Sequence, residues 1–487
     1  MSIARKAITS TLWMSGLNYI GIGVGAILAI LRDRVLLPYE NGVYMFGMSV
    51  VDTLFIFAAL SFNIAVIQAD DDKEDLYSTA FVLTIFLSAA IIVVAAVTGV
   101  FLSWQGVEQI KINAFLVLAF FAAINLFTIL FSSFMEKKLE YNKVARINFL
   151  QLISFPVASY ILVTQGAGAW GMVIGQSLAF AVSFIGMAIV SKYPIGFKYN
   201  PTTAKWFLSM GWKLIFSRGM EVAFTRAGTL ITDSMLGTTL QGSYSRALKY
   251  WEMAPQTVSP AVVTVALPTY SQLKHNVEKL SKAFTMVLFF MIRVLLPFVL
   301  VFAILSESFL LILGDQWLDA VPVLRVLSIG ALLAPVFENM KQLIYAEGKP
   351  ELIVKTRIAQ LVIFLPAMFG LVYLYGISGA AMAMVVNFTV GVIIAFFYVR
   401  RFVSVQWRVS VALPFAWAIL AAGIVLLAPL PQLGYGPFLQ FALEALYLVG
   451  IFIVLEFITE RKRIIEYWQF VRTALKAKES GEEIPVA

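Results

Sequence analysis

One segment of this chain, residues 208–236, is apolar enough to cross a membrane and yet carries five charged side chains. A charge at the centre of a bilayer costs at least about 2.5–3.5 kcal/mol, so each one needs a compensating interaction. At a helical spacing of about 100° per residue, most polar residues of this segment share about a third of a turn. This polar stripe comprises Arg218, Glu221, Thr225, Thr229, Thr232 and Asp233, with Arg226 at its edge.

The polar stripe could bind a phosphate group. A guanidinium stays charged when it is desolvated, and its fork can hold two phosphate oxygens. A similar polar face recurs in 243–272, where it includes Arg246 and Lys249. The predicted substrate-binding cations are Arg218, Arg226, Lys249 and Arg246, and the predicted polar cavity residues are Thr225, Thr229 and Asn18. The alternative is pairing within the protein, for instance of Arg218 with Glu221 or of Arg246 with Glu252.

Carboxylates inside apolar segments could carry a coupling ion. Transport against a gradient needs a site that binds H⁺ or Na⁺, and an intramembrane carboxylate is the usual one. The candidates are Asp52, Glu221, Glu252 and Glu338. A salt bridge to a nearby arginine explains each of them equally well.

The whole chain has the composition of a membrane protein. Of its 487 residues, 60% are hydrophobic and only 13% charged, and the mean hydropathy is +0.87. Apolar runs of about twenty residues, for example 353–374 and 377–399, recur along nearly its whole length. They predict an all-α integral membrane protein with about fourteen transmembrane helices. With no cysteine and one histidine, the chain is expected to bind no metal and no cofactor.

Lysine and arginine are concentrated in alternate connectors. Residues 137–143 and 400–408 are basic, whereas 165–169 and 375–378 contain neither residue type. The positive-inside rule then predicts that both termini are cytoplasmic. Arg32 and Arg34 belong to the opposite side, and we expect them at the outer rim with their charged ends at the interface. Basic residues form no single face, which argues against nucleic acid as a partner.

Several phrases of the sequence occur twice, about two hundred residues apart. "RDRVLLPYENGVY" at 32–44 has a counterpart in "TDSMLGTTLQGSY" at 232–244, and "MEKKLEYNKVARI" at 135–147 in "AEGKPELIVKTRI" at 346–358. These similar segments occur in the same order in both halves of the chain. They predict a duplicated six-helix unit with a substrate site between the halves. The predicted divisions are 1–206 and 207–402 as six-helix lobes, 403–460 as two further helices, and 461–487 as a basic cytoplasmic tail.

The two halves differ in chemistry. At the positions that match Arg218, Glu221 and Thr225, the first half has Asn18, Gly21 and Gly25. The charge of a substrate would therefore be bound mainly by the second half.

The quoted motifs resemble those of Wzx-type polysaccharide flippases. "LLPYENGVY" at 36–44 is similar to their first extracytoplasmic loop, and "GSYSRALK" at 242–249 to their eighth helix. "GDQWLDAVPVLRVLSIGALL" at 314–333 and "YAEGKPELIVK" at 345–355 resemble the start of their tenth helix and the loop that follows. The resemblance covers nearly the whole chain. It implies the multidrug/oligosaccharidyl-lipid/polysaccharide exporter fold, in which two six-helix lobes form a V and two C-terminal helices follow.

The resemblance further implies a function. It predicts a flippase that moves an undecaprenyl-diphosphate-linked oligosaccharide from the cytoplasmic to the outer leaflet of a bacterial inner membrane by alternating access. The expected partners are this substrate, H⁺ or Na⁺, membrane lipids, and polysaccharide polymerase or export machinery. We expect no enzyme activity, because the chain has no P-loop and its connectors are short. A multidrug/cation antiporter of the same fold and a non-transporting scaffold of a glycan-assembly complex are the alternatives.

Overall fold

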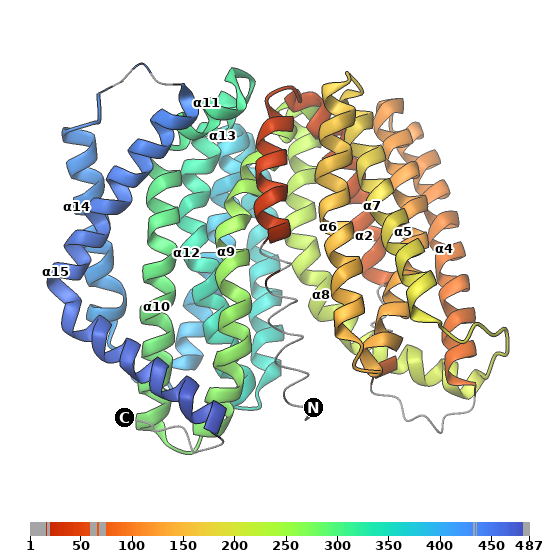
Figure 1. The fold of residues 1–487 in the computed structure, drawn as a ribbon. Coiled ribbons are helices and arrows are strands. Elements are labelled where there is room, and N and C mark those ends of the chain that lie inside the picture. Colours follow the sequence, from red (N-terminus) through yellow and green to blue (C-terminus); the bar gives the residue numbers. More distant parts are fainter. Residues whose placement is uncertain are drawn as a thin grey trace. The chain divides into compact units, whose positions relative to one another are not determined.

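The computed structural model describes Gly16 and residues 20–58, 66–67, 75–431, 434 and 436–480, and in these residues it contains helices and no strands. Residues 20–33 are helical. The chain divides into two compact units, 1–245 and 246–487, and the boundary lies within the helix α9, Thr238–Leu273 (Figure 1). The other elements are α2 (Pro38–Ala58), α4 (Leu76–Trp104), α5 (Gln109–Lys137), α6 (Tyr141–Thr164), α7 (Gly168–Ser191), α8 (Pro201–Leu236), α9 (Thr238–Leu273), α10 (Val277–Ile304), α11 (Ser306–Leu313), η1 (Asp315–Ala320), α12 (Val321–Ala346), α13 (Pro350–Val399), η2 (Arg408–Ala412), α14 (Leu413–Leu427) and α15 (Pro437–Ser480).

Nine helices in the described part of the chain are long and apolar enough to span a membrane. The all-α membrane class is therefore confirmed, whereas the number fourteen stays a prediction. One of the nine, α13, is 50 residues long and comprises the two predicted spans 353–374 and 377–399. Its two helical parts meet at Gly376, where φ is 58° and ψ −139°. Only glycine adopts this backbone conformation without strain, so the sequence permits the break at this residue.

Each compact unit has its own apolar core. In the first unit, Phe131 and Phe134 of α5 pack with Met187 of α7 and with Tyr193 in the connector that follows. The Tyr193 hydroxyl donates a hydrogen bond to the carbonyl of Tyr77, and burial raises the pKa of this phenol. In the second unit, α10 packs against α12, α14 and α15, and its apolar face lies in the main core cluster. Large apolar side chains such as Val97 of α4 remain exposed, as lipid-facing residues do.

The first turns of α2 and α9 approach one another closely at two glycines. A Cβ added at Gly42 would lie closer than 3.0 Å to the carbonyl oxygen of Thr238, and one added at Gly242 would lie closer than 3.0 Å to that of Pro38. The side chain of Asn41 donates a hydrogen bond to the carbonyl of Gly242 (2.8 Å). Gly42 and Gly242 occupy matching positions of the two repeated phrases, as do Pro38 and Thr238. The contact is therefore reciprocal, which is the pattern of a local two-fold axis.

We predict that Gly242→Ala lowers the free energy of unfolding by about 1–3 kcal/mol, because the added methyl group must displace backbone. Gly370→Ala is the matched control. This helical glycine has nothing within 4 Å of an added Cβ, and its substitution should leave stability unchanged or raise it slightly. Thermal unfolding of the purified protein in detergent measures both. Equal melting of Gly242→Ala and the wild type would show that the close approach is not a constraint.

Candidate functional site

The helix that carries the polar stripe begins at a well-defined cap. Asn200 precedes α8 and accepts hydrogen bonds from the backbone N–H groups of Thr202 and Thr203 (3.0 and 3.3 Å). Pro201 occupies the first helical position, where its missing N–H costs nothing. From this start α8 runs without interruption to Leu236 and packs against α2 and α4 in the first unit. The cap thus fixes the residue at which the helix begins, and the packing against α2 and α4 holds the helix in the first unit.

The C-terminal end of the stripe is buried against protein. The Nζ of Lys111 on α5 lies 3.0 and 2.9 Å from the two carboxylate oxygens of Asp233. Both side chains are only 8% exposed. Thr232 is fully buried and donates its hydroxyl hydrogen bond to the carbonyl of Gly228 within α8. This end of the stripe therefore joins α8 to α5.

The middle of the stripe forms a second ion pair, which is only half-buried. Arg226 of α8 lies 2.5 Å from the carboxylate of Asp52 on α2. Each of the two side chains is 28% exposed. The hydroxyl of Thr229, one turn further along α8, donates to the carbonyl of Thr225 (3.3 Å) and is buried. The structure thus brings together a predicted substrate-binding cation and a predicted ion-coupling carboxylate.

These two ion pairs differ in what they can do. A buried pair offers no access to a ligand, and removal of one partner strands a charge away from water. A partly exposed guanidinium can exchange its carboxylate for another anion, because a phosphate oxygen reproduces the same charge-assisted hydrogen bonds. Among the predicted cations of α8, Arg226 is the one with a described side chain, and its partial exposure suits anion binding.

The remaining candidates in the second unit also have charged or aromatic neighbours. Lys249 lies 4.0 Å from Glu252 and is 56% exposed. The guanidinium of Arg246, a buried side chain, lies 5.4 Å from the ring centroid of Trp317. Glu338 lies 2.5 Å from Lys341 on the same helix. Their roles in substrate binding and ion coupling stay predictions.

Three predicted site residues lie outside what the structure describes. Asn18 is not among the described residues, and the side chains of Arg218 and Glu221 are not described although their backbone is helical. Substrate binding by Arg218 and Asn18 and ion binding by Glu221 therefore stay predictions from the sequence.

The expectation that Arg32 reaches the outer interface is wrong. Arg32 is 2% exposed and donates hydrogen bonds to Asp33 and to the hydroxyl of Ser159 on α6 (3.0 Å). Its ring contact is with Phe155, 5.5 Å from the guanidinium carbon. Snorkelling requires a free path to water, and the neighbouring carboxylate supplies a closer compensation.

A buried charged cluster in the second unit was not predicted. Arg293 of α10 lies 2.8 Å from Glu456 of α15 and also contacts Glu460 of that helix. All three side chains are less than 10% exposed. The presence of Arg293 and Glu456 within long apolar runs of the sequence was the available signal, because each charge needs a partner in the membrane. The cluster anchors the C-terminal helix to the second unit's core.

The Lys111–Asp233 pair gives a direct test of this packing. Lys111→Met should lower the free energy of unfolding by about 3–5 kcal/mol, because it leaves the Asp233 carboxylate buried and uncompensated. Lys111→Met combined with Asp233→Leu should recover most of that loss. Lys143→Met removes a lysine from the exposed Lys143–Glu140 pair and should cost less than about 1 kcal/mol. Similar melting shifts for both single variants in detergent would contradict the buried role of Lys111.

The comparisons with known sequences agree on one kind of protein. Residues 30–322 match the model of the family described as "Polysaccharide biosynthesis protein". An "uncharacterized membrane protein in cps region" of Klebsiella pneumoniae is 24% identical, over 82% of this chain and 84% of that protein. The lipopolysaccharide biosynthesis protein WzxC of Escherichia coli is 22% identical, over 80% of this chain and 78% of WzxC.

Solved structures identify the fold. The lipid II flippase MurJ in an inward closed conformation superimposes with a TM-score of 0.74 at 14% identity, covering 93% of this chain and all of that one. A multidrug resistance MATE family transporter of the MOP superfamily, in an inward-facing conformation, gives 0.58 at 16% identity, over 77% of this chain and 94% of that one. At such identities the similarity establishes the fold of these transporters, as the motifs at 36–44 and 242–249 predicted.

Proposed function

The chain belongs to the polysaccharide biosynthesis protein family, and on this premise we propose that it is a flippase for a lipid-linked oligosaccharide. The substrate is an oligosaccharide on undecaprenyl diphosphate, which moves from the cytoplasmic to the outer leaflet of the bacterial inner membrane by alternating access. Both termini of this multi-pass membrane protein lie in the cytoplasm. The names of the relatives support this proposal, since WzxC is a lipopolysaccharide biosynthesis protein and MurJ a lipid II flippase.

The Asp52–Arg226 pair is the observation that carries the proposal. Its guanidinium lies on α8, within the segment 208–236 that the sequence predicts to cross the membrane, and it remains 28% exposed. A diphosphate brings more negative charge than one carboxylate and can hold the guanidinium by two oxygens. In the substrate-free protein Asp52 is then the counter-ion of Arg226, and the substrate replaces it.

The displaced carboxylate supplies a site for a coupling ion. Without Arg226, Asp52 would remain as a half-buried charge, which favours the binding of H⁺ or Na⁺. Glu252 stands at the matching position of the second repeat and has its own cation, Lys249. Carboxylates on both repeats are thus available for ion coupling. Movement of the lipid across the membrane needs no chemical conversion of the substrate. The protein acts as a transporter and not as an enzyme.

Flipping of a fluorescent undecaprenyl-diphosphate oligosaccharide in proteoliposomes tests the proposal. Arg226→Ala should slow flipping about 10–100-fold, since a charge-assisted hydrogen bond contributes about 1.5–3 kcal/mol. Arg325→Ala is the matched control, because Arg325 pairs with the exposed Glu307 and should not affect transport. Movement of small organic cations in place of the lipid would establish the multidrug exporter. Unchanged flipping in a folded Arg226→Ala protein would remove Arg226 from the site.

Asp52→Asn separates substrate binding from ion coupling. It frees Arg226 from its carboxylate, so binding of the diphosphate lipid should be equal to or tighter than in the wild type. The same variant should lose the stimulation of flipping by an imposed H⁺ or Na⁺ gradient. Binding is measured with the detergent-solubilised protein, and gradient dependence in proteoliposomes. Weaker binding by Asp52→Asn would contradict its assignment as counter-ion.

A further inference from the structure

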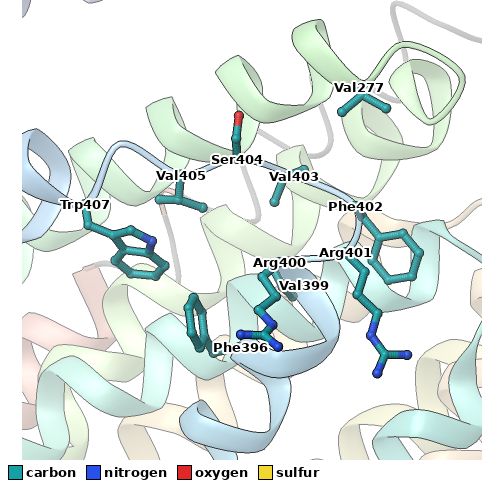
Figure 2. Close-up of a pocket in the computed structure, with 10 residues that line it drawn as sticks. All are labelled: Val277, Phe396, Val399, Arg400, Arg401, Phe402, Val403, Ser404, Val405 and Trp407. Atoms are coloured by element: carbon teal, nitrogen blue, oxygen red, sulfur yellow. The ribbon is translucent and has the colours of Figure 1, made fainter.

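The connector between α13 and α14 lines a half-open cavity of about 400 Å³ in the second unit (Figure 2). The end of α13, residues 400–405, Trp407 and Val277 at the start of α10 line it. The two helical spans Pro350–Val399 and Ser410–Leu427 flank the connector. Since one apolar span ends just before the cavity and the next begins just after it, the cavity lies at a membrane–water boundary.

The backbone of this connector is held in place. The N–H of Ser404 donates a hydrogen bond to the hydroxyl of Ser281 on α10 (3.0 Å), and the Ser281 side chain is buried. Val403 is 5% exposed and belongs to the core cluster of the second unit. The N–H groups of Arg400 and Arg401 bond to the carbonyls of Phe396 and Tyr398, in the last turns of α13. The cavity is therefore preformed.

Two cations line this cavity, and a third contacts one of its lining rings. Arg400 and Arg401 lie in its wall and are exposed, and their side chains extend to the same side of the connector in Figure 2. The Nζ of Lys349 lies 4.7 Å from the ring centroid of Phe402, which also lines the cavity. Among the ion pairs of the described residues, none of these three cations has a carboxylate partner. The local charge is thus positive and suits an anion.

Apart from Ser404, the rest of the wall is apolar or aromatic. The rings of Phe396 and Trp407 meet edge to face, with centroids 5.3 Å apart. Aromatic side chains at the end of a membrane span favour the level of the lipid head groups. The cavity thus combines a cationic rim with apolar walls at the depth where a head group joins its acyl chains.

From this combination we infer that the cavity binds the phosphate head group of an anionic phospholipid of the surrounding leaflet. Arg400 and Arg401 hold the phosphate oxygens, because adjacent guanidiniums offer paired donors to a tetrahedral anion. Lys349 adds a third charge, and Phe396, Phe402 and Trp407 contact the glycerol and the first acyl carbons. Basic pockets between membrane helices bind anionic head groups in this way. This binding does not depend on transport of the oligosaccharide.

Native mass spectrometry of the full-length protein from detergent tests the inference with added phosphatidylglycerol, phosphatidylcholine or undecaprenyl phosphate. The wild type should retain phosphatidylglycerol in preference to phosphatidylcholine. Arg400→Gln combined with Arg401→Gln should weaken the binding of the first phosphatidylglycerol molecule at least about tenfold. Arg461→Gln combined with Lys462→Gln removes two exposed charges from α15 and should change this binding less than twofold.

Three outcomes would overturn the inference. Equal loss in both double variants would mean general attraction to a basic surface, and equal binding of phosphatidylcholine would exclude a head-group site. Retention of undecaprenyl phosphate alone would make the cavity a site for the carrier lipid. Since Arg400 and Arg401 are exposed, the Gln variant should melt like the wild type. If it does not fold, Arg400→Lys combined with Arg401→Lys gives the same test, with a partial loss expected because an ammonium binds phosphate as a point charge.

Discussion

Compensation of charge inside an apolar medium is the constraint on which the arrangement of these helices depends. A lone charge in the membrane is costly, so a charged residue on one helix requires a partner on another. Lys111 and Asp233 join α5 to α8, and Arg293 joins α10 to Glu456 of α15. Each pair contributes little net stability compared with a well-packed apolar contact, but the wrong neighbour would leave a charge uncompensated. The pairs therefore specify which helices pack together.

The same interaction has a different consequence where water reaches it. The Asp52–Arg226 pair has the chemistry of the Lys111–Asp233 pair, yet each side chain is 28% exposed instead of 8%. Water can then reach the guanidinium, which is the property on which the proposed exchange of Asp52 for the substrate depends. Exposure, and not residue type, is what distinguishes these two pairs.

The duplicated sequence provides a second constraint at the first turns of α2 and α9. Gly42 and Gly242 allow each backbone to reach the carbonyl of the other helix, at Thr238 and Pro38. A side chain at either glycine would separate the two helix starts. The two matching segments thus share the glycines that allow this close approach, whereas most of the charged residues at matching positions differ.

The sequence alone determined the membrane class and the family, because both depend on hydropathy and on local motifs such as those at 36–44 and 242–249. The break within α13 also followed from the sequence, since a glycine separates two apolar runs at Gly376. The sequence also identified Asp52 and Arg226, but separately, as charges in apolar segments. Only the tertiary structure decided that they are partners, and that Arg32 is buried beside Asp33 when the sequence suggested the interface. Helical periodicity gives the face on which a charge lies, whereas the identity of its partner depends on which helix packs against that face.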